Sequence, residues 1–424
     1  MIDTSTPAYA TPSRAGARET AREMTRLYAQ RALTAGAATF LRDPAAILFT
    51  RKGRRDPYAH YERIRSLGPM PASRFGLWLV TGHAAAKEVL RSRHFGVSSS
   101  VDGAPTEAVD LSLLQLDPPD HTRLRRLVAP AFSPRRLKEF DALVAETVTD
   151  LVRGLPRGEA FDLVDRIASP LPVRVITHLL GVPEDDHERF RRHGAAIAQV
   201  LDGFSSAAHY RRVRAAEADL ADLFTRLFAE RRADPRDDVI TDLASAPEDT
   251  ISPHEMVTLC QLLLIAGFET TVNLISSTVL NLRRAGQWDL VTADPSLADA
   301  AIEETLRFDP PVQLTGRYAI TDTEVAGIPV PAGRVVLPLI GATGRDPEVF
   351  ANPGVYDLTR TPEADHLAFS AGVHYCLGAP LARLEARVAV EALARDLPML
   401  RPAGRVRHRA TTTLRGPLHL PVIA

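Results

Sequence analysis

The sequence predicts a mainly α-helical fold with small β-sheets, because helical periodicity dominates and β-branched segments are short and few. Apolar residues recur at three- and four-residue spacing, as on the buried face of an amphipathic helix, over residues 58–66, 84–91, 134–155, 216–231, 253–284, 296–307 and 379–397. Segments rich in β-branched residues, which favour strands, cover only 77–81, 323–328, 335–339 and 418–423. These patterns predict a helical body that carries small satellite sheets.

Local signals at the ends of these segments support the assignments. Ser252 is followed by Pro253, which predicts the cap and the first-turn proline of the longest helix. The pair Ala332-Gly333 precedes Val335, which predicts a turn between two strands.

The chain is predicted to form one domain behind an N-terminal extension. Residues 1–45 are rich in alanine, arginine and threonine and have a weak apolar face, so we expect a partly ordered extension there. No repeat period and no Gly/Ser-rich linker follows, so residues 46–424 are predicted to fold as a single domain.

Composition narrows the class of protein. Hydrophobic residues make up 45%, and the net charge of −1 gives no strong field toward nucleic acid or an anionic membrane, so we expect neither as a partner. The two cysteines, Cys260 and Cys376, exclude a disulfide framework and suit a reducing compartment. No run approaches roughly 18 consecutive apolar residues, and the N-terminal segment lacks a signal-peptide pattern. We expect a cytoplasmic monomer.

Cys376 lies in a glycine-punctuated loop directly before a predicted helix. A thiolate is a soft metal ligand and a strong electron donor. Gly372 and Gly378 let the backbone approach a bulky flat partner, and the N–H groups of the following helix favour an anionic sulfur. Phe369 would shield the sulfur, and His374 could donate to an anionic group. The alternative is a buried free cysteine in a tight loop.

Small residues interrupt the bulky apolar pattern of the longest helix at Ala266 and Gly267. Glycine costs a helix roughly 1 kcal/mol, and a close-packed planar ligand with a diatomic gas is one reason to accept that cost. Glu269 and Thr270 follow with an acid and a hydroxyl, and such a hydroxyl can bond the carbonyl one turn earlier. The alternative is an ordinary buried helix that contains two polar residues.

Two further pairs of residues have helical spacing. Glu304 and Arg307 are three apart on one face, a pattern that usually marks a solvated surface pair. His121 and Arg125 are four apart and share a face. Arginine binds carboxylates with a fork of donors, although a single arginine is more often solvated.

In this order and spacing, the motifs resemble those of the cytochrome P450 family, the heme-thiolate monooxygenases, in its soluble bacterial form. The resemblance spans residues 55–424 and implies a single-domain cytochrome P450 fold that holds heme b (iron protoporphyrin IX) with Cys376 as the iron ligand. The sequence departs from the family pattern at Ser370, where most relatives have glycine, and at Gly344, where asparagine is usual. Arg360 is the candidate for a third cation beside the Glu304–Arg307 pair.

The resemblance also implies the residues that hold the cofactor. The family positions for heme contacts correspond to His121, Arg125, Ala266, Arg317, Phe369, His374 and Gly378. The arginines and histidines of this set match donors to the two heme propionates. Glu304 and Arg307 match a buried structural pair that braces the cysteine loop.

The implied reaction activates O2 to hydroxylate or epoxidise a neutral or weakly polar organic substrate, in secondary metabolism. Glu269 and Thr270 match the catalytic pair that supplies protons. The substrate-pocket positions implied by the family are Leu263, Val312, Leu314 and Thr412.

The sequence shows no flavin or dinucleotide domain, so electrons are expected from outside, and the resemblance implies that they come from NAD(P)H through a ferredoxin or flavodoxin with its reductase. Three alternatives remain open. A peroxide-driven heme-thiolate enzyme and a heme-based sensor or carrier do not need the acid–hydroxyl pair. A non-redox helical binding protein does not need Cys376.

Overall fold

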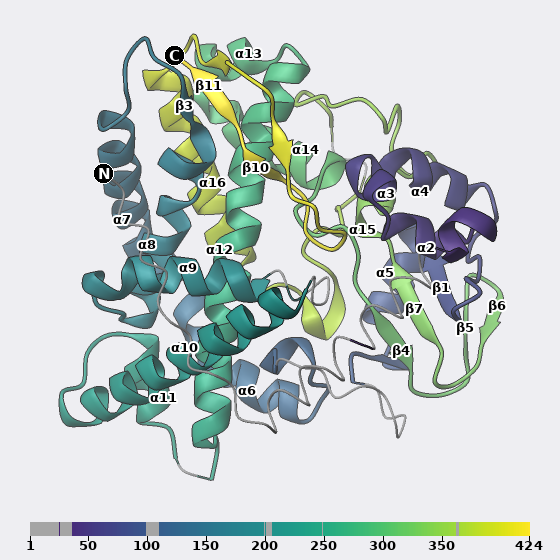
Figure 1. The fold of residues 1–424 in the computed structure, drawn as a ribbon, viewed down its shortest axis with the longest axis horizontal. Coiled ribbons are helices and arrows are strands. Elements are labelled where there is room, and N and C mark those ends of the chain that lie inside the picture. The colour runs from purple at the N-terminus through teal and green to yellow at the C-terminus, as the bar shows by residue number, and fades with distance from the viewer. Residues whose placement is uncertain are drawn as a thin grey trace.

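The computed structural model describes residue 25 and residues 36–98, 110–198, 200, 206–247, 249–361 and 364–424. In these ranges a large helical part adjoins a smaller part with short strands, as predicted (Figure 1). The helices are α2 (Pro44–Leu48), α3 (Arg51–Arg55), α4 (Pro57–Arg65), α5 (His83–Arg91), α6 (Asp120–Val128), α7 (Pro134–Arg153), α8 (Pro170–Leu180), α9 (His187–Ala198), α10 (Ala207–Ala233), α11 (Val239–Ala244), α12 (Pro253–Arg284), α13 (Trp288–Ala293), α14 (Ala298–Phe308), α15 (Ile340–Thr343) and α16 (Ala379–Asp396).

The strands are short and gather in four small sheets. They are β1 (Leu77–Val80), β2 (Phe95–Gly96), β3 (Phe161–Asp162), β4 (Arg317–Ala319), β5 (Thr323–Val325), β6 (Ile328–Val330), β7 (Val335–Pro338), β8 (Arg401–Pro402), β9 (Arg407–His408), β10 (Pro417–His419) and β11 (Pro421–Ile423). The largest sheet has the order β1-β7-β4-β2, with β1 parallel to β7 and the other pairs antiparallel. Arg317 therefore lies on an inner strand, opposite Val336.

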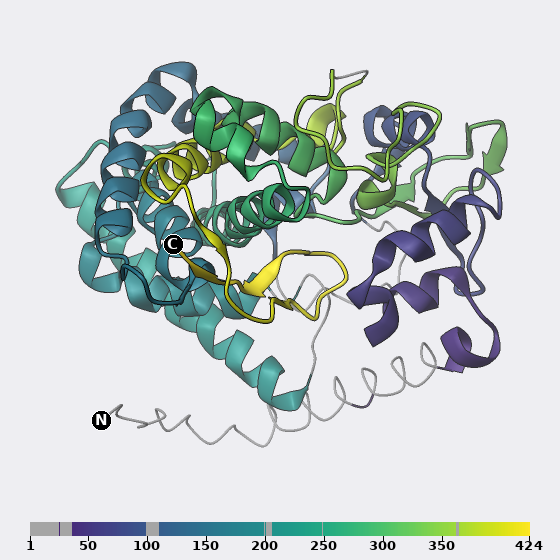
Figure 2. The ribbon, with the colours of Figure 1, turned by 90° about the horizontal axis from the view of Figure 1, so that it is seen from above.

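Helix α12 is the centre of the helical part, where α8, α9, α10, α14 and α16 pack around it (Figure 1 and Figure 2). It is long and apolar enough to cross a membrane, but 83% of its most apolar window is buried inside the protein. A core helix that other helices surround can be equally long and apolar, because its apolar residues are buried against those helices.

The predicted start of α12 at Ser252 is confirmed by a capping box. The Ser252 hydroxyl accepts a hydrogen bond from the Glu255 N–H at 3.3 Å, and the Glu255 carboxylate accepts one from the Ser252 N–H at 2.8 Å. Arg123 of α6 adds an ion pair with Glu255 at 2.6 Å. These bonds satisfy N–H groups that a helix start otherwise leaves unpaired.

The predicted single strand over 323–328 is wrong. The structure divides this segment and its continuation into the hairpin β5–β6, with Ala326 (φ 49°) and Gly327 (φ 77°) in the left-handed region at the turn. Two consecutive positive φ angles match the twist of a two-residue hairpin, which the β-branched pattern alone does not reveal. The turn predicted at Ala332-Gly333 is confirmed, with Gly333 at φ 79° between β6 and β7.

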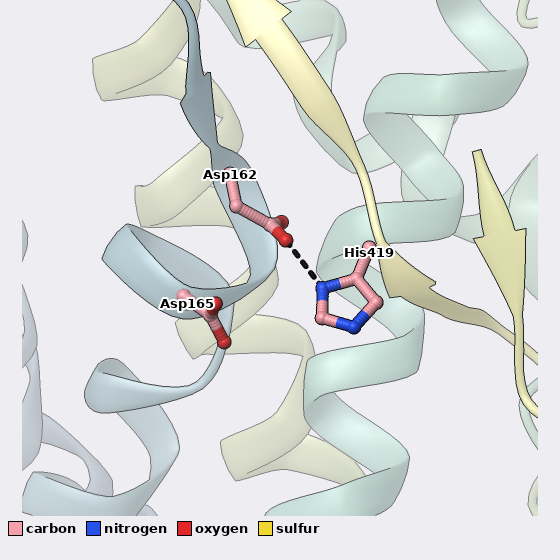
Figure 3. A group of neighbouring side chains, drawn as sticks. All are labelled: Asp162, Asp165 and His419. Atoms are coloured by element: carbon pink, nitrogen blue, oxygen red, sulfur yellow. Dashed lines mark hydrogen bonds and ion pairs between the residues drawn. The ribbon is translucent and has the colours of Figure 1, made fainter. Parts of the chain in front are cut away.

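The C-terminal strands are tied to the helical part by Asp162. Its carboxylate accepts hydrogen bonds from His419 Nδ1 at 2.7 Å and from the Leu420 N–H at 3.0 Å, where β11 pairs with β3 (Figure 3). Asp165 lies on the next turn of the chain (Figure 3). These bonds hold the C-terminal strand β11 beside β3.

Most of the predicted N-terminal extension lies outside the described residues, so that division of the chain stays a prediction. The predicted boundary at residue 45 lies inside α2, whose cap is the buried residue Asp43. The Asp43 carboxylate accepts hydrogen bonds from the Ala45 and Ala46 N–H groups at 3.0 and 2.9 Å and from the Ser73 hydroxyl at 3.0 Å. The described part of the folded body therefore begins before residue 45.

The cap of α12 predicts a pH-dependent contribution to stability. Hydrogen bonds from Arg123 lower the pKa of Glu255 from 4.5 to about 2. A carboxylate with a lowered pKa stabilises the folded state above its ordinary pKa and loses this contribution as pH falls through the folded value. We expect Glu255→Gln to reduce the free energy of unfolding by about 1 kcal/mol at neutral pH, because the group is partly exposed.

Urea unfolding followed by circular dichroism from pH 7 to pH 3 measures this difference, which should shrink below about pH 4.5. Glu146→Gln, at an exposed position of α7, is the matched control and should change little. An equal loss at pH 7 and pH 3 would show that the charge on Glu255 does not contribute.

Candidate active site

The loop that carries Cys376 is held in a tight, partly left-handed conformation. Gly372 has φ 70°, and a Cβ at this position would lie 2.6 Å from the carbonyl oxygen of Leu90 in α5. Ser370 also has a positive φ, of 63°, although it is not glycine. The Cys376 N–H donates to the Phe369 carbonyl at 3.0 Å and closes the loop. Only glycine fits at 372, whereas Ser370 adopts a conformation that costs an L-residue about 1–2 kcal/mol.

The sulfur of Cys376 lies at the start of α16. The N–H groups of Gly378 and Ala379 donate to it, as the position of the helix predicts. We expected this arrangement to favour the anion, but burial has the larger effect and raises the pKa of Cys376, against the N–H groups and the charges of Arg125 and Arg383. The thiol therefore keeps its proton unless a metal ion replaces it.

A network beside the sulfur was not predicted as a unit. Glu303 of α14 pairs with Arg383 Nε at 2.6 Å and accepts from His366 Nε2 at 3.2 Å. Burial would raise the pKa of Glu303, but these two partners outweigh burial and lower it to about 2. The Arg383 guanidinium also lies 4.5 Å from the ring centre of Phe369, which is a cation–π contact. The network fixes Phe369 next to Cys376.

The structure brings together residues that the family resemblance assigned to carboxylates. We call His121, Arg125, Arg317 and His374 the donor set. The rings of His121 and His374 have centres 4.3 Å apart. The Arg125 guanidinium donates to the Tyr375 carbonyl at 2.7 Å, in the cysteine loop. Residues from α6, β4 and the cysteine loop therefore converge.

Among the described residues, Asp117 is the acid whose charge acts on the donor set, and no carboxylate lies within hydrogen-bond distance of it. Burial lowers the pKa of Arg317 to about 10, and its guanidinium donates to Thr315 Oγ1 at 2.9 Å and the Gly316 carbonyl at 2.7 Å rather than to a carboxylate. The nearest acid to His374 is Asp117, at 3.8 Å, which is too long for a hydrogen bond. Burial, Arg317 and His121 lower the pKa of His374 to about 4, so this side chain is neutral at pH 7.

Two buried nitrogen atoms of the donor set, His121 Nδ1 and His374 Nε2, have no hydrogen-bond partner. A buried polar atom without a partner costs stability, and a buried arginine that hydrogen-bonds no carboxylate favours an anionic ligand. A ligand with two carboxylates would satisfy both nitrogen atoms and neutralise Arg317. The residues present therefore fit the propionates of heme b.

The surface of α12 is accessible at the predicted small residues. Ala266 is exposed and Thr270 is half-buried, although Ile265 and Phe268 beside them are buried. The Thr270 hydroxyl donates to the Ala266 carbonyl at 2.7 Å. Gly267 has a different reason from the predicted one, because a Cβ there would lie 3.1 Å from Ile176 Cδ1 of α8. The glycine permits close helix packing.

Glu269 is paired with a residue that the sequence did not indicate. Arg409, which follows β9, lies 2.7 Å from Glu269 Oε2 and 3.2 Å from Glu269 Oε1. Its Nε also donates to Asn273 Oδ1 at 3.0 Å. Burial raises the pKa of Glu269, and the charge of Arg409 opposes this shift. The acid of the predicted pair is thus buried and held by a cation from the C-terminal segment.

Glu304 and Arg307 form a buried bidentate ion pair, with two nitrogen–oxygen distances of 2.6 Å. Arg307 also donates to the carbonyls of Gly344, Pro353 and Val355 at 2.7, 2.9 and 2.9 Å. Arg360 Nε lies 3.4 Å from Glu304 Oε1, where a third cation was expected.

The departure from asparagine at Gly344 has a steric reason. A Cβ at this position would lie 2.0 Å from the Arg307 carbonyl oxygen, so a side chain does not fit without a backbone shift.

The four predicted pocket residues pack in different surroundings, and their common role stays a prediction. Leu263 of α12 and Val312 belong to the large core around α12. Leu314 instead packs in a separate core with Leu48 and Tyr61, and the Thr412 hydroxyl is 3.5 Å from the Leu48 carbonyl. Successive residues of a regular strand point to opposite sides and residues two apart share a side, so the separate cores of Val312 and Leu314 show that this segment is not a regular strand.

Comparisons with known proteins identify a family and a fold. A family model described as cytochrome P450 matches residues 291–403. The chain is similar to cytochrome P450 monooxygenase PikC of Streptomyces venezuelae, with 37% identity over 361 residues, 81% of this chain and 85% of that protein. It is also similar to 6-deoxyerythronolide B hydroxylase of Saccharopolyspora erythraea, with 35% identity over 392 residues, 87% of this chain and 96% of that protein. Its fold resembles the structure of Mycobacterium smegmatis CYP164A2 with econazole bound, with a TM-score of 0.82 and 38% identity, covering 90% of this chain and 99% of that one.

The cysteine loop should not tolerate a side chain at residue 372. We expect Gly372→Ala to lower the free energy of unfolding by roughly 2 kcal/mol or more, because the new methyl group would meet the Leu90 carbonyl and the backbone conformation disfavours alanine. Urea unfolding measures the change. Gly354→Ala is the control, since a Cβ at 354 meets nothing within 4 Å. Similar midpoints for both variants would contradict the packing of this loop against α5.

Proposed function

The chain belongs to the cytochrome P450 family, and from this premise we propose that it is a monooxygenase of secondary metabolism that hydroxylates or epoxidises a neutral or weakly polar organic molecule. The observation that carries the proposal is the donor set at the cysteine loop, whose arginines and histidines hydrogen-bond no carboxylate among the described residues. Heme b is the cofactor of the family, and its two propionates fit that set. When bound, heme supplies the activation of O2, and a thiolate ligand favours O–O cleavage.

Cys376 is proposed as the iron ligand. Its thiol loses the proton on metal binding, and the N–H groups of Gly378 and Ala379 then donate to the anionic sulfur. The Glu303–Arg383 pair holds Phe369 against this side of the loop. Donors to the sulfur and an aromatic cover restrict the access of water and keep the ligand in place.

Thr270 and Glu269 are proposed to supply protons. The Thr270 hydroxyl donates to the Ala266 carbonyl, so the lone pairs of its oxygen remain available to accept a proton. Glu269 precedes it and is buried, with its pKa raised by burial. A raised pKa brings proton exchange by a carboxyl group closer to the working pH, which favours general acid–base catalysis. An intact acid–hydroxyl pair favours O2-dependent turnover over peroxide-driven turnover or a sensor role.

Family members use small-molecule substrates and redox partners. We propose that electrons from NAD(P)H reach this protein through a ferredoxin or flavodoxin with its reductase, and that it acts as a cytoplasmic monomer. Val373 and Tyr375, close to Cys376 in the chain, are 56% and 43% exposed. Arg126 of α6 is also exposed, and its neighbour Arg125 contacts the cysteine loop through the Tyr375 carbonyl. An apolar centre with a basic residue suits an acidic electron carrier.

Cys376→Ser tests the proposed ligand. We expect the reduced, carbon-monoxide-bound protein to lose the absorption characteristic of thiolate-ligated heme, and reductase-dependent monooxygenation to fall to background, because serine does not provide a soft thiolate. Absorption spectra and product analysis measure both effects. Cys260→Ser, in the buried part of α12, is the control and should keep the spectrum. A thiolate spectrum that persists in Cys376→Ser would refute the assignment.

Arg317→Leu tests the proposed propionate contact. A charge-assisted hydrogen bond contributes about 1.5–3 kcal/mol, so we expect heme to transfer to apomyoglobin roughly 10- to 150-fold faster than from the unaltered protein. Arg334→Leu, at an exposed position before β7, is the matched control and should release heme at the original rate. Equal rates in all three proteins would place the propionates elsewhere.

A further inference from the structure

A second cluster of polar side chains, distinct from the residues of the proposed active site, lies where the C-terminal strands meet the segment after β3. Its members are Asp162, Asp165 and His419, and one ligand atom from each lies within 4.8 Å of those of the other two (Figure 3). Asp162 ends β3, Asp165 belongs to the turn that follows, and His419 ends β10. Two carboxylates and one imidazole therefore converge from segments that are far apart in the chain.

The Asp162 carboxylate is held in a fixed orientation. Its Oδ1 atom accepts hydrogen bonds from the Val164 and Leu420 N–H groups, both at 3.0 Å. Its other oxygen, Oδ2, lies 2.7 Å from His419 Nδ1. In metal sites, hydrogen bonds of this kind orient the carboxylate that binds the ion. The backbone of β3 and β11 thus orders one oxygen and one nitrogen ligand in advance.

Asp165 completes the cluster from an unusual backbone segment. The Ser169 N–H donates to the Val164 carbonyl at 2.8 Å, and this five-residue span belongs to one turn of π-helix over Val164–Ala168. Such turns are rare and often occur at functional sites. The Asp165 carboxylate is exposed and forms no hydrogen bond or ion pair with a described residue. It is therefore free to rotate toward the other two ligands and shorten the remaining distance.

Arginines near the cluster are held by other groups. Arg153 and Arg166 line the cleft beside it, but their guanidinium groups contact another aspartate and a backbone carbonyl, at 3.0 and 2.9 Å. Arg191 of α9 is bound by Glu188 at 2.7 and 2.8 Å and acts on Asp165 only through its charge. These charges oppose a cation, so an ion at this place has to be held by direct coordination rather than by long-range attraction.

Water reaches the cluster. An open cleft of about 560 Å³ is lined in part by Asp162 and Asp165. The side chains of His419 and Asp162 are 37% and 20% exposed. Solvent can therefore supply the ligands that complete the coordination of an ion held by three protein atoms, as it does in metal sites with an open position.

The ligand types select the class of ion. An imidazole nitrogen suits Zn²⁺ and similar transition-metal ions, which carboxylates also bind. Ca²⁺ requires about six to eight oxygen ligands, and Mg²⁺ also prefers oxygen. Two carboxylates and one imidazole therefore favour Zn²⁺ over either of these ions.

We propose that Asp162, Asp165 and His419 bind a divalent transition-metal ion of the Zn²⁺ type through two carboxylate oxygens and His419 Nδ1. The ion replaces the proton that Nδ1 donates to Asp162, and this proton leaves to solvent. Because His419 lies 257 residues after Asp162, the ion cross-links the C-terminal strands to the helical part. A ligand that binds only the folded state stabilises that state. This site is independent of the proposed function of Cys376.

Isothermal titration calorimetry of the heme-loaded protein with ZnCl₂, on protein without a polyhistidine tag, tests the proposal. We expect one Zn²⁺ per chain, with the same ratio in metal analysis after dialysis. Asp165→Asn and His419→Gln should each weaken binding by about tenfold or more, because even groups outside the ligand sphere contribute that much. Zn²⁺ should raise the midpoint of thermal unfolding of the unaltered protein more than that of either variant.

Asp185→Asn is the matched control, because it removes the same charge from an exposed acid in another segment and should leave Zn²⁺ binding unchanged. Asp165→Asn is the decisive variant, since this side chain makes no hydrogen bond whose loss could disturb folding. Equal affinity in all three variants and the unaltered protein would show that Zn²⁺ binds at other side chains, and the proposal would be refuted. A lack of Zn²⁺ binding by the unaltered protein refutes it as well, and tighter binding of Ca²⁺ than of Zn²⁺ would overturn the class of ion.

Discussion

The buried ion pair between Glu304 and Arg307 determines where the chain lies before it reaches Cys376. Removing two charges from water is costly, and the pair offsets this cost through two short contacts and three further bonds from Arg307 to backbone carbonyls. Those carbonyls belong to residues 344–355, so α14 fixes the segment that leads to the cysteine loop. Such a pair is not replaceable one residue at a time, because the remaining charge would be buried alone.

The cysteine loop then depends on contacts at both of its ends. On one side Gly372 touches the backbone of α5, and on the other the sulfur accepts N–H groups at the start of α16. The donor set completes the site with a buried arginine and two neutral histidines. A protein that buries an arginine without a hydrogen-bonded carboxylate is stabilised by a ligand that supplies one, since binding to the folded state alone shifts folding toward that state. Cofactor binding and folding are therefore linked in this chain.

Much of this arrangement follows from local sequence patterns, and the remainder depends on contacts between distant segments. Helical spacing is sufficient to predict that Glu304 meets Arg307, and the Ser252-Pro253 signal is sufficient to place the start of α12. Neither spacing nor composition indicates that Arg409 meets Glu269, because 140 residues separate them in the chain. The division of 323–328 into a hairpin was missed because Ala326, a residue without special turn preference, adopts a left-handed conformation. Leu314 packs away from Val312 because the segment between them is irregular.

The close contact between Gly267 and Ile176 links the evolution of two helices. A methyl group on residue 267 would press on the Ile176 side chain, which would have to shift by a few tenths of an ångström or become shorter, as in a change of isoleucine to valine. The two positions should therefore change together among related chains, with larger residues on α12 accompanied by smaller ones on α8. A variant library that varies residues 267 and 176 together therefore allows larger side chains on α12 with less strain than one that varies residue 267 alone.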